Sequence, residues 1–348
     1  MKTETKTIIK IACVYTGIIF GAGFASGQEL MAFFVGHGAR GMLAAALAGV
    51  VLALCGWAVL DICAREKIGS YVDFMAAVFG KRLGAVLDII VGLFIFIIFA
   101  AMLAGFGASV EQVFNVPFSA GAVVLAVICF AVLLFDAQGV VKINLVATPF
   151  LVVGAVALGL ASITDPAVPA FAVSSVTRSW PFSSLIYASY NILTATAILA
   201  SLGGIVTTRR IAKYSGILGG IFVGGIALLF TTTLWINLSA VEGLEIPMLA
   251  LAAHQGAFAQ YSYMLLLMLA IFTTAAANAF AAVKWLEGRL GFRGLRIGVS
   301  VCILAVCAAH LGFSVIVSNL YSFFGYLGIF KVAAILIYFF FGRNKRIK

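Results

Sequence analysis

The chain has 348 residues, of which 64% are hydrophobic and only 10% are charged, with 22 Lys and Arg against 12 Asp and Glu. An ordinary soluble domain carries roughly 25% charged residues, so this chain lacks the polar surface that would cover a globule in water. The composition excludes a soluble enzyme, a disordered chain and a disulfide-stapled secreted domain, and it predicts a polytopic membrane protein. The net charge of +10 is therefore first tested as a topology signal.

Ten apolar runs are long enough to cross about 30 Å of hydrocarbon, which takes about 20 helical residues. We expect helices, because a helix satisfies its own backbone hydrogen bonds in lipid and no period-two alternation of polar and apolar residues is present. The predicted spans of this all-α integral membrane protein are Ile8–Val35, Gly41–Ala64, Leu83–Ala108, Ser119–Phe135, Val141–Ile163, Ser183–Val206, Gly216–Val241, Tyr261–Trp285, Leu295–Phe313 and Ile316–Phe341.

The basic residues lie mostly on one side of these spans. All but three of the 22 (Arg40, Arg178 and Lys331) fall in loops or span ends on the side of the N-terminus. This bias predicts that both termini are cytoplasmic in a multi-pass protein of the plasma (inner) membrane. Because orientation accounts for the cationic excess, we expect the lipid bilayer as a partner and no nucleic acid. The N-terminus could imitate a signal peptide, but its apolar stretch is too long and we interpret it as a retained span.

A proline-containing loop near the middle of the chain, at about 164–182, divides the ten spans into five and five. Five is odd, so the second half crosses the membrane in the opposite sense, which permits an inverted repeat of about 8–163 and 183–341 within one transport domain, 1–348. The first span of each half is unusually polar. Residues 17–29 include four glycines, Ser26, Gln28 and Glu29, and residues 183–194 are rich in Ser, Tyr, Asn and Thr. Paired interruptions of this kind indicate a transporter site, so we expect helices 1 and 6 to be broken.

Each of these features has a plainer interpretation. Glycines spaced as Gly17 and Gly21 are also typical of close helix packing. A carboxylate such as Glu29 is costly inside a membrane and is seldom kept without a purpose, but one near the surface can extend its head group to water.

The run from Gly21 to Glu29, the polar sixth span and the sequence Ala270-Ile271-Phe272-Thr273-Thr274 together resemble the amino acid–polyamine–organocation superfamily, most of all a little-characterised bacterial branch of amino acid permeases. The resemblance implies a LeuT-type fold of ten helices in a 5+5 inverted repeat with broken helices 1 and 6. It also implies secondary active transport, by alternating access, of a small neutral amino acid or related amine in symport with a cation.

The same resemblance implies a coupling ion and its ligands. In sodium-coupled members, a carbonyl and two hydroxyls of span eight meet two carbonyls of the broken first helix, and a hard cation suits such oxygen ligands. The matching positions for sodium are Gly17, Phe20, Ala270, Thr273 and Thr274. Helical threonines also commonly bond back to the preceding turn, so protons stay an alternative to Na⁺. No other cofactor is expected.

For the substrate, the resemblance places a carboxylate near the free amides of the break and an ammonium near span six. The implied substrate-binding residues are Ala22, Gly23, Phe24, Ser26, Tyr187, Ser189, Tyr190 and Asn191. Each tyrosine could equally be a packing residue, and the asparagines could bond between helices. Three polar residues inside spans are candidates for coupling or gating, namely Glu29, Asn278 and Lys331. Asp61, Asp88 and Asp136 lie at inner span ends beside basic loops, where ordinary ion pairing explains them.

Two other classes of function are alternatives to transport. An amino-acid-sensing membrane subunit similar to spore-germinant receptors would share the architecture and bind without net transport. An intramembrane enzyme is disfavoured because no HExxH or GxSxG motif and no closely spaced carboxylate pair is present. The sequence does not specify the substrate or the oligomeric state.

Overall fold

The computed structural model describes residues 2–134, 138–167, 179–291 and 295–342, and every regular element within them is helical. The first half of the chain contains α1 (Lys2–Ile19), α2 (Ala22–Ala25), α3 (Gln28–Phe33), the 3₁₀ turn η1 (Val35–His37), α4 (Ala39–Glu66), α5 (Tyr71–Phe114), α6 (Phe118–Leu134) and α7 (Gln138–Thr164). The second half contains α8 (Trp180–Ser201), η2 (Gly203–Ile205), α9 (Arg209–Ile236), α10 (Leu238–Val241), α11 (Pro247–His254), α12 (Ala257–Leu290), α13 (Leu295–Ala309), α14 (Phe313–Val315), the π-helix η3 (Ile316–Tyr321) and α15 (Ser322–Phe341).

Six stretches of helix are long and apolar enough to cross a membrane, and these are α4, α5, α8, α9, α12 and the continuous run from α14 to α15. Three shorter apolar helices lie at 118–134, 149–164 and 295–309. The structure thus supports a multi-pass membrane protein, and the count of ten spans stays a prediction.

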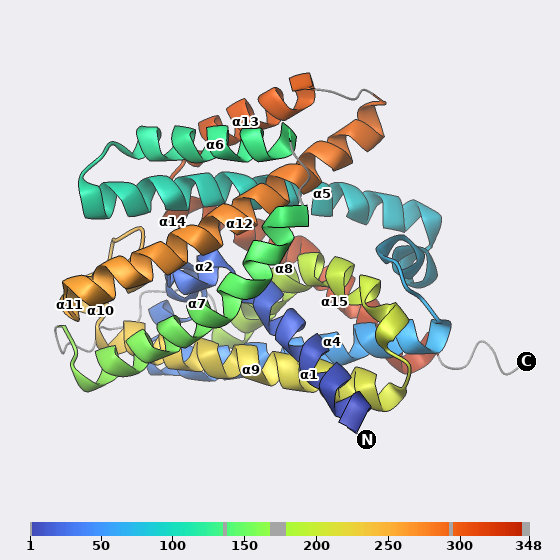
Figure 1. Ribbon diagram of the computed structural model, residues 1–348. Coiled ribbons are helices and arrows are strands. Elements are labelled where there is room, and N and C mark those ends of the chain that lie inside the picture. The colour runs from blue at the N-terminus through green and yellow to red at the C-terminus, as the bar shows by residue number, and fades with distance from the viewer. Residues whose placement is uncertain (1, 135–137, 168–178, 292–294, 343–348) are drawn as a thin grey trace, which may run out of the picture.

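The helices pack as two groups (Figure 1). In one group α1, α4, α8 and α9 contact one another, and in the other α5, α6, α12 and α13 do so. Helix α7 contacts α12 and α9 and so links the two groups, while α15 packs on α8, α4 and α5. The residues at the junction of the two groups are those of the interrupted first span, because α2 and α3 contact elements of both.

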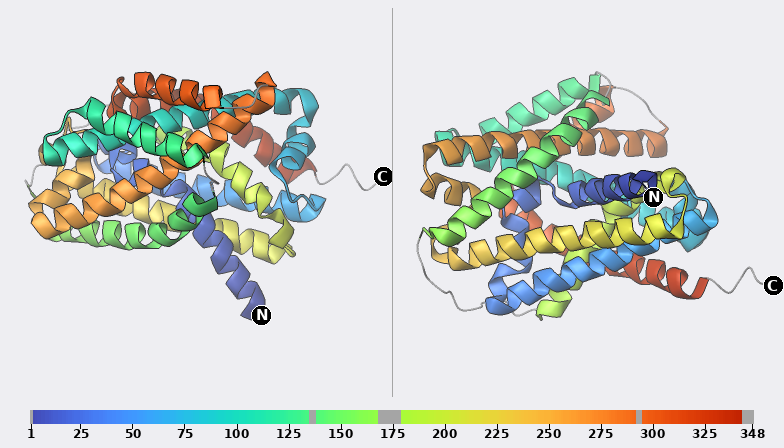
Figure 2. Two further views of the ribbon diagram at one scale, coloured as in Figure 1. Left: turned by 45° about the horizontal axis from the view of Figure 1, so that its top comes forward. Right: turned by 60° about the horizontal axis from the view of Figure 1, so that its bottom comes forward.

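Small residues bring α4 and α9 close together along their length (Figures 1 and 2). A Cβ added to Gly49 would lie 2.6 Å from Gly224 Cα, and one added to Gly220 would collide with the backbone of Ala53. Backbones at this distance make many van der Waals contacts, which is how helices associate without a hydrophobic driving force in lipid.

Helix α5 contains a bend that divides it into two helical segments. Gly80 has φ +70° and ψ 176°, a conformation that glycine adopts readily because it has no Cβ. The bend separates a short helical segment, 71–79, from the longer helix that contains the predicted third span.

The first span is interrupted as the sequence predicts. Helix α1 ends at Ile19, Gly21 is extended with φ −85° and ψ −176°, and Gly27 is left-handed with φ +86°. Glycine is suited to both positions, and the two breaks isolate α2 as a single turn.

The expected break in the sixth span is wrong. Helix α8 runs without interruption from Trp180 to Ser201, and the separate 3₁₀ turn η2 follows after Leu202. Two polar side chains of this stretch bond to carbonyls one turn back, Asn191 Nδ2 to Tyr187 O at 2.9 Å and Ser184 Oγ to Trp180 O at 3.0 Å. Such bonds are compatible with a continuous helix, and with no glycine or proline between residues 183 and 194 nothing obliges the backbone to unwind.

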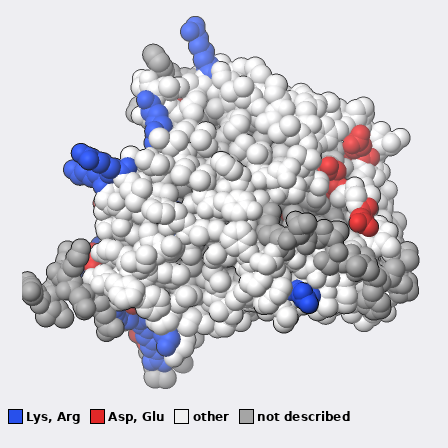
Figure 3. Space-filling model, turned by 180° about the vertical axis from the view of Figure 1, so that it is seen from behind, with Lys and Arg blue, Asp and Glu red and all other residues white. Residues whose placement is uncertain are grey.

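Charge is divided between the two ends of the molecule (Figure 3). In this view the Lys and Arg side chains gather mainly at one end, while the most visible Asp and Glu side chains lie toward the other, with a broad uncharged band between them. Arg178, Asp136 and the last six residues lie outside the described residues.

Candidate functional site

The interrupted backbone of the first span is held in place by local hydrogen bonds. Ser26 Oγ donates to Gly23 O at 2.7 Å and accepts from Gln28 N–H at 3.2 Å. A single buried hydroxyl therefore bridges α2 and α3 across the left-handed Gly27. Ser26 was predicted as a substrate residue, and here its hydroxyl stabilises the break itself.

Helices α11 and α12 each donate a hydrogen bond to a carbonyl group of the interrupted segment. Met248 N–H, in the first turn of α11, donates to Ser26 O at 3.0 Å, and Tyr263 Oη of α12 donates to Ala25 O at 2.6 Å. Carbonyl groups that leave a helical ladder need other donors when they are buried, and α11 and α12 supply them. Sequence reasoning missed both partners, because α11 lies in a connection between spans and Tyr263 belongs to no motif that the sequence analysis used.

Glu29 lies at the start of α3 with its carboxyl group buried in the protein. Tyr190 Oη of α8 donates to Glu29 Oε2 at 2.6 Å, a hydrogen bond between residues 161 positions apart. The other oxygen, Oε1, lies against Gly23, where an added Cβ would collide with it. The carboxylate thus lies between the turn α2 and helix α8. This is where the family resemblance predicts the substrate, between the break in the first span and the sixth span.

Aromatic rings surround Tyr190. Its ring centroid lies 5.4 Å from those of Phe33 and Tyr187, 5.3 Å from Tyr321 and 6.0 Å from Phe94. We call this set, together with Phe324, whose ring stacks on Phe94 at 4.7 Å, the aromatic cluster. It joins α3, α5, α8, η3 and α15.

Four members of the aromatic cluster were not predicted: Phe33, Phe94, Tyr321 and Phe324. Phe94 belongs to an almost wholly apolar stretch in which nothing distinguishes one Phe from the next. Tyr321 ends a π-helix, whose wider turn changes which residues share a face, so helical periodicity could not have placed it.

The other predicted substrate residues have different neighbours. Phe24 packs its ring 4.8 Å from Phe20 and 5.7 Å from Phe230 of α9, as a core residue does. Ser189 faces α15, since a Cβ on Gly328 would lie 2.7 Å from Ser189 O. Ala22 and Gly23 form the first turn of α2, in which backbone N–H groups have no intrahelical acceptor.

The predicted sodium ligands come from two places in the fold. At the end of α1, Gly21 N–H donates to Ile19 O at 2.8 Å. In a regular helix it would donate to Gly17 O, so Gly17 O lacks that hydrogen bond. On α12, Thr273 is buried and its Oγ1 donates to Ala270 O at 3.1 Å. The contact between α12 and the first span runs through α2.

Two more predicted residues, Thr274 and Asn278, interact with each other along α12. Asn278 Nδ2 donates to Thr274 O at 2.8 Å, a bond within one turn of the helix.

Lys331 is completely buried in α15. Its Nζ donates to Leu193 O of α8 at 3.0 Å and lies 5.2 Å from the centre of the Tyr71 ring. No ion pair between Lys331 and Glu29 occurs among the described residues.

Ion pairs explain two of the carboxylates at span ends. Asp61 pairs with Arg65 at 2.9 Å and with Arg209 at 3.4 Å, which connects α4 to α9. Asp88 pairs with Arg289 at 2.9 Å and accepts a 3.2 Å hydrogen bond from Trp285, which connects α5 to α12.

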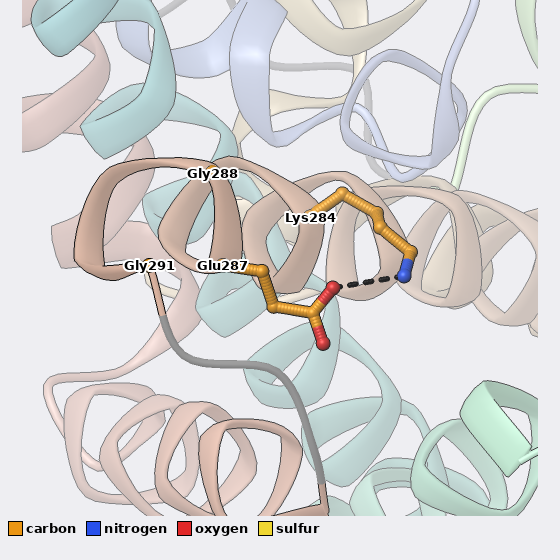
Figure 4. Close-up of a pocket in the computed structure, with 4 residues that line it drawn as sticks. All are labelled: Lys284, Glu287, Gly288 and Gly291. Carbon is orange, nitrogen blue, oxygen red and sulfur yellow. Dashed lines mark hydrogen bonds and ion pairs between the residues drawn. The ribbon is translucent and has the colours of Figure 1, made fainter.

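A surface hollow at the C-terminal end of α12 is lined by Lys284, Glu287, Gly288 and Gly291 (Figure 4). Lys284 Nζ and Glu287 Oε2 form an ion pair of 2.8 Å on its wall. All four residues come from the last turns of one helix, far along the chain from Tyr263 and Thr273, so this hollow is not part of the site around Glu29.

Solved structures show which fold this arrangement is. It is the LeuT fold, shared by membrane transporters of several kinds. An inward-facing structure of Mhp1 superposes with a TM-score of 0.63 at 12% identity, covering 98% of this chain and 78% of that one. A structure of a variant of the Eremococcus coleocola manganese transporter superposes with a TM-score of 0.62 at 17% identity, covering 97% and 79%. Mhp1 is described as a nucleobase-cation-symport-1 family transporter.

Two proteins of Bacillus subtilis (strain 168) are similar in sequence along nearly the whole chain. The uncharacterized protein YyaD is 27% identical over 323 residues, which is 92% of this chain and 94% of that protein. The uncharacterized membrane protein YkvI is 22% identical over 345 residues, 97% of each. No protein-family model matches the chain.

Proposed function

We propose that this protein is a secondary active transporter that carries a small neutral amino acid or related amine in symport with a cation, Na⁺ in preference to H⁺. The observation that carries the proposal is the interrupted first span, with Glu29 buried beside it and bonded to Tyr190. Unwound backbone and a carboxylate at this depth are tolerated where they line a protein-enclosed site, and in transporters they mark the substrate and ion sites.

The pairing of helices supports an inverted repeat as the basis of alternating access. Counting α1 to α3 as the first span and the run from α14 to α15 as the tenth, spans at equal positions in the two halves touch: α4 contacts α9, α5 contacts α12 and α6 contacts α13. A pseudo-two-fold axis produces such pairs. The packing into two groups fits rocking of one group against the other.

The sodium assignment is supported by the carbonyl of Gly17, which the broken ladder frees, and by the buried hydroxyl of Thr273. We further propose that both termini are cytoplasmic in the plasma membrane, because the charge division follows the positive-inside rule.

The test is uptake into liposomes containing the purified protein. Radiolabelled amino acids and amines are screened with Na⁺ or K⁺ outside, and the double variant Thr273→Ala plus Thr274→Ala is compared with wild type. Thr232→Ala is the matched control, because Thr232 is a half-buried residue of α9 whose hydroxyl bonds to its own helix, at Leu228 O.

We expect Na⁺ to stimulate uptake by wild type and by the control, and the double variant to lose that stimulation. Uptake that responds to a pH gradient and ignores Na⁺ would replace sodium by protons. Tight binding without uptake or counterflow would favour a sensor.

A further inference from the structure

The Glu29 carboxylate has more capacity for bonds than the protein uses. An ionised carboxylate offers about four lone-pair positions, and Tyr190 Oη occupies one of them. None of the ion pairs among the described residues includes Glu29. A buried carboxyl group is costly in its charged form unless it is paired, and otherwise it takes up a proton, so an ionised Glu29 has room for a cation from outside the chain.

The surroundings indicate what kind of cation fits. A hard metal ion takes a shell of six or more oxygen ligands, but the neighbours of the Glu29–Tyr190 pair are mostly the rings of the aromatic cluster. Ring faces attract organic ammonium groups. The oxygen-rich positions predicted for sodium lie elsewhere, at the end of α1 and on α12.

Tyr321 brings the π-helix of α14–α15 into this arrangement. Its ring lies 5.3 Å from the rings of both Tyr190 and Phe94, and Tyr190 is the hydrogen-bond partner of Glu29. The element η3 also contacts α3, which carries Glu29. Single π-turns in helices are frequently found at functional sites, and this one places a phenol ring against Tyr190, which donates to Glu29.

We propose that Glu29 and the aromatic cluster form a subsite for the ammonium group of the transported compound. The carboxylate supplies the opposite charge, the rings of Tyr190, Tyr321 and Phe94 supply cation–π contacts, and Gly23 leaves room for Oε1 beside α2. The inference rests on the proposed function and narrows its substrate class to compounds with a primary or methylated ammonium group, with or without a carboxylate. It assigns substrate binding to Glu29 in place of ion coupling.

The test measures binding to the full-length purified protein in detergent, in K⁺ buffer without Na⁺, by thermal shift and calorimetry. The probes are three matched triads of amino acid, decarboxylated amine and deaminated acid. They are alanine, ethylamine and propanoate; leucine, 3-methylbutylamine and 4-methylpentanoate; and phenylalanine, 2-phenylethylamine and 3-phenylpropanoate. The three members of each triad differ at the ammonium and carboxylate positions around one side chain.

Two pairs of variants isolate the subsite. Glu29→Gln removes the charge but can still accept the Tyr190 hydrogen bond, and Glu111→Gln, an exposed carboxylate, is its matched control. Tyr321→Leu removes the ring, while Tyr321→Phe keeps it. The melting temperature of each variant without ligand shows that it is folded.

We expect the amine of at least one triad to bind and the corresponding acid not to bind. Glu29→Gln should weaken amine binding by about 30-fold or more, as loss of one partner of a buried charge pair does. Tyr321→Leu should weaken it by about fivefold, Tyr321→Phe, which keeps the ring, should weaken it less than Tyr321→Leu does, and Glu111→Gln should leave it unchanged.

Equal binding of amines to wild type and Glu29→Gln would overturn the inference, as would binding of the acids in their place or binding of no ammonium compound in the panel. Uptake of a panel compound by Glu29→Gln with unchanged KM would also overturn it while leaving the proposed transport intact. Conversely, Glu29-dependent ammonium binding in a protein that shows neither uptake nor counterflow would uphold the subsite and refute transport.

Discussion

Gly23 is the position at which one added methyl group should disrupt the site. A Cβ there would collide with Glu29 Oε1 and lie 3.1 Å from Cδ, closer than the 3.5–4.0 Å at which carbon atoms pack. In Gly23→Ala the carboxyl group must therefore move by about 1 Å. The bond from Tyr190 Oη, now 2.6 Å long, would stretch toward the limit of hydrogen bonding.

The magnitude follows from the bond that is lost. A hydrogen bond to a charged group contributes about 1.5–3 kcal/mol, so Gly23→Ala and Tyr190→Phe should each lower the free energy of unfolding by about that amount. Because both remove the same bond, the double variant should be little worse than either single one, with a coupling of about 1.5–3 kcal/mol.

The assay is unfolding by SDS titration in mixed micelles for the four members of this double-mutant cycle. Gly21→Ala is the matched stability control, since it lies in the same break, has a negative φ and has no atom within 4 Å of an added Cβ. Additive effects in the cycle, or an equal loss from Gly21→Ala, would refute the reasoning.

Two further predictions concern the buried ammonium of Lys331 and the packing of α4 against α9. Lys331→Met removes one hydrogen bond to Leu193 O together with a buried charge. Because these two effects oppose each other, the free energy of unfolding should change by no more than about 1–2 kcal/mol in SDS titration. A loss above about 3 kcal/mol would instead show that the Lys331 ammonium compensates a buried carboxylate. Gly220→Ala should cost about 1–3 kcal/mol because its Cβ would meet the Ala53 backbone, whereas Gly225→Ala, with no atom within 4 Å of the added Cβ, should be neutral or slightly stabilising in the same assay. A similar loss from both glycine variants would contradict the close α4–α9 contact.

The all-helical membrane fold and the break in the first span were predictable, because both depend on strong local signals. The lengths of apolar runs determine where membrane helices form, and Gly27 allows a left-handed backbone conformation that other residues resist. The predicted break in the sixth span is wrong because polar residues alone do not unwind a helix. Asn191 and its neighbours bond back along α8 and leave the ladder intact.

The sequence predicts the polar residues of the site but not the residues that reach it through tertiary packing. Glu29 and Tyr190 stand out as polar residues in apolar spans, and the structure joins them. Phe94 and Tyr321 reach the same place through packing of distant helices, and Met248 through a short helix between spans. Contacts of that kind depend on tertiary arrangement and leave no local pattern in the sequence.

The central claim is that the protein uses an ion gradient to move a solute, and accumulation in vesicles tests it most directly. Liposomes containing the protein are loaded with K⁺ and diluted into Na⁺ with a labelled compound that binds in the thermal-shift screen. The account predicts that the compound accumulates above its outside concentration and that the excess is lost when an ionophore collapses the Na⁺ gradient. Equilibration to equal concentrations under every imposed gradient of Na⁺ or H⁺, or binding without entry, would contradict it.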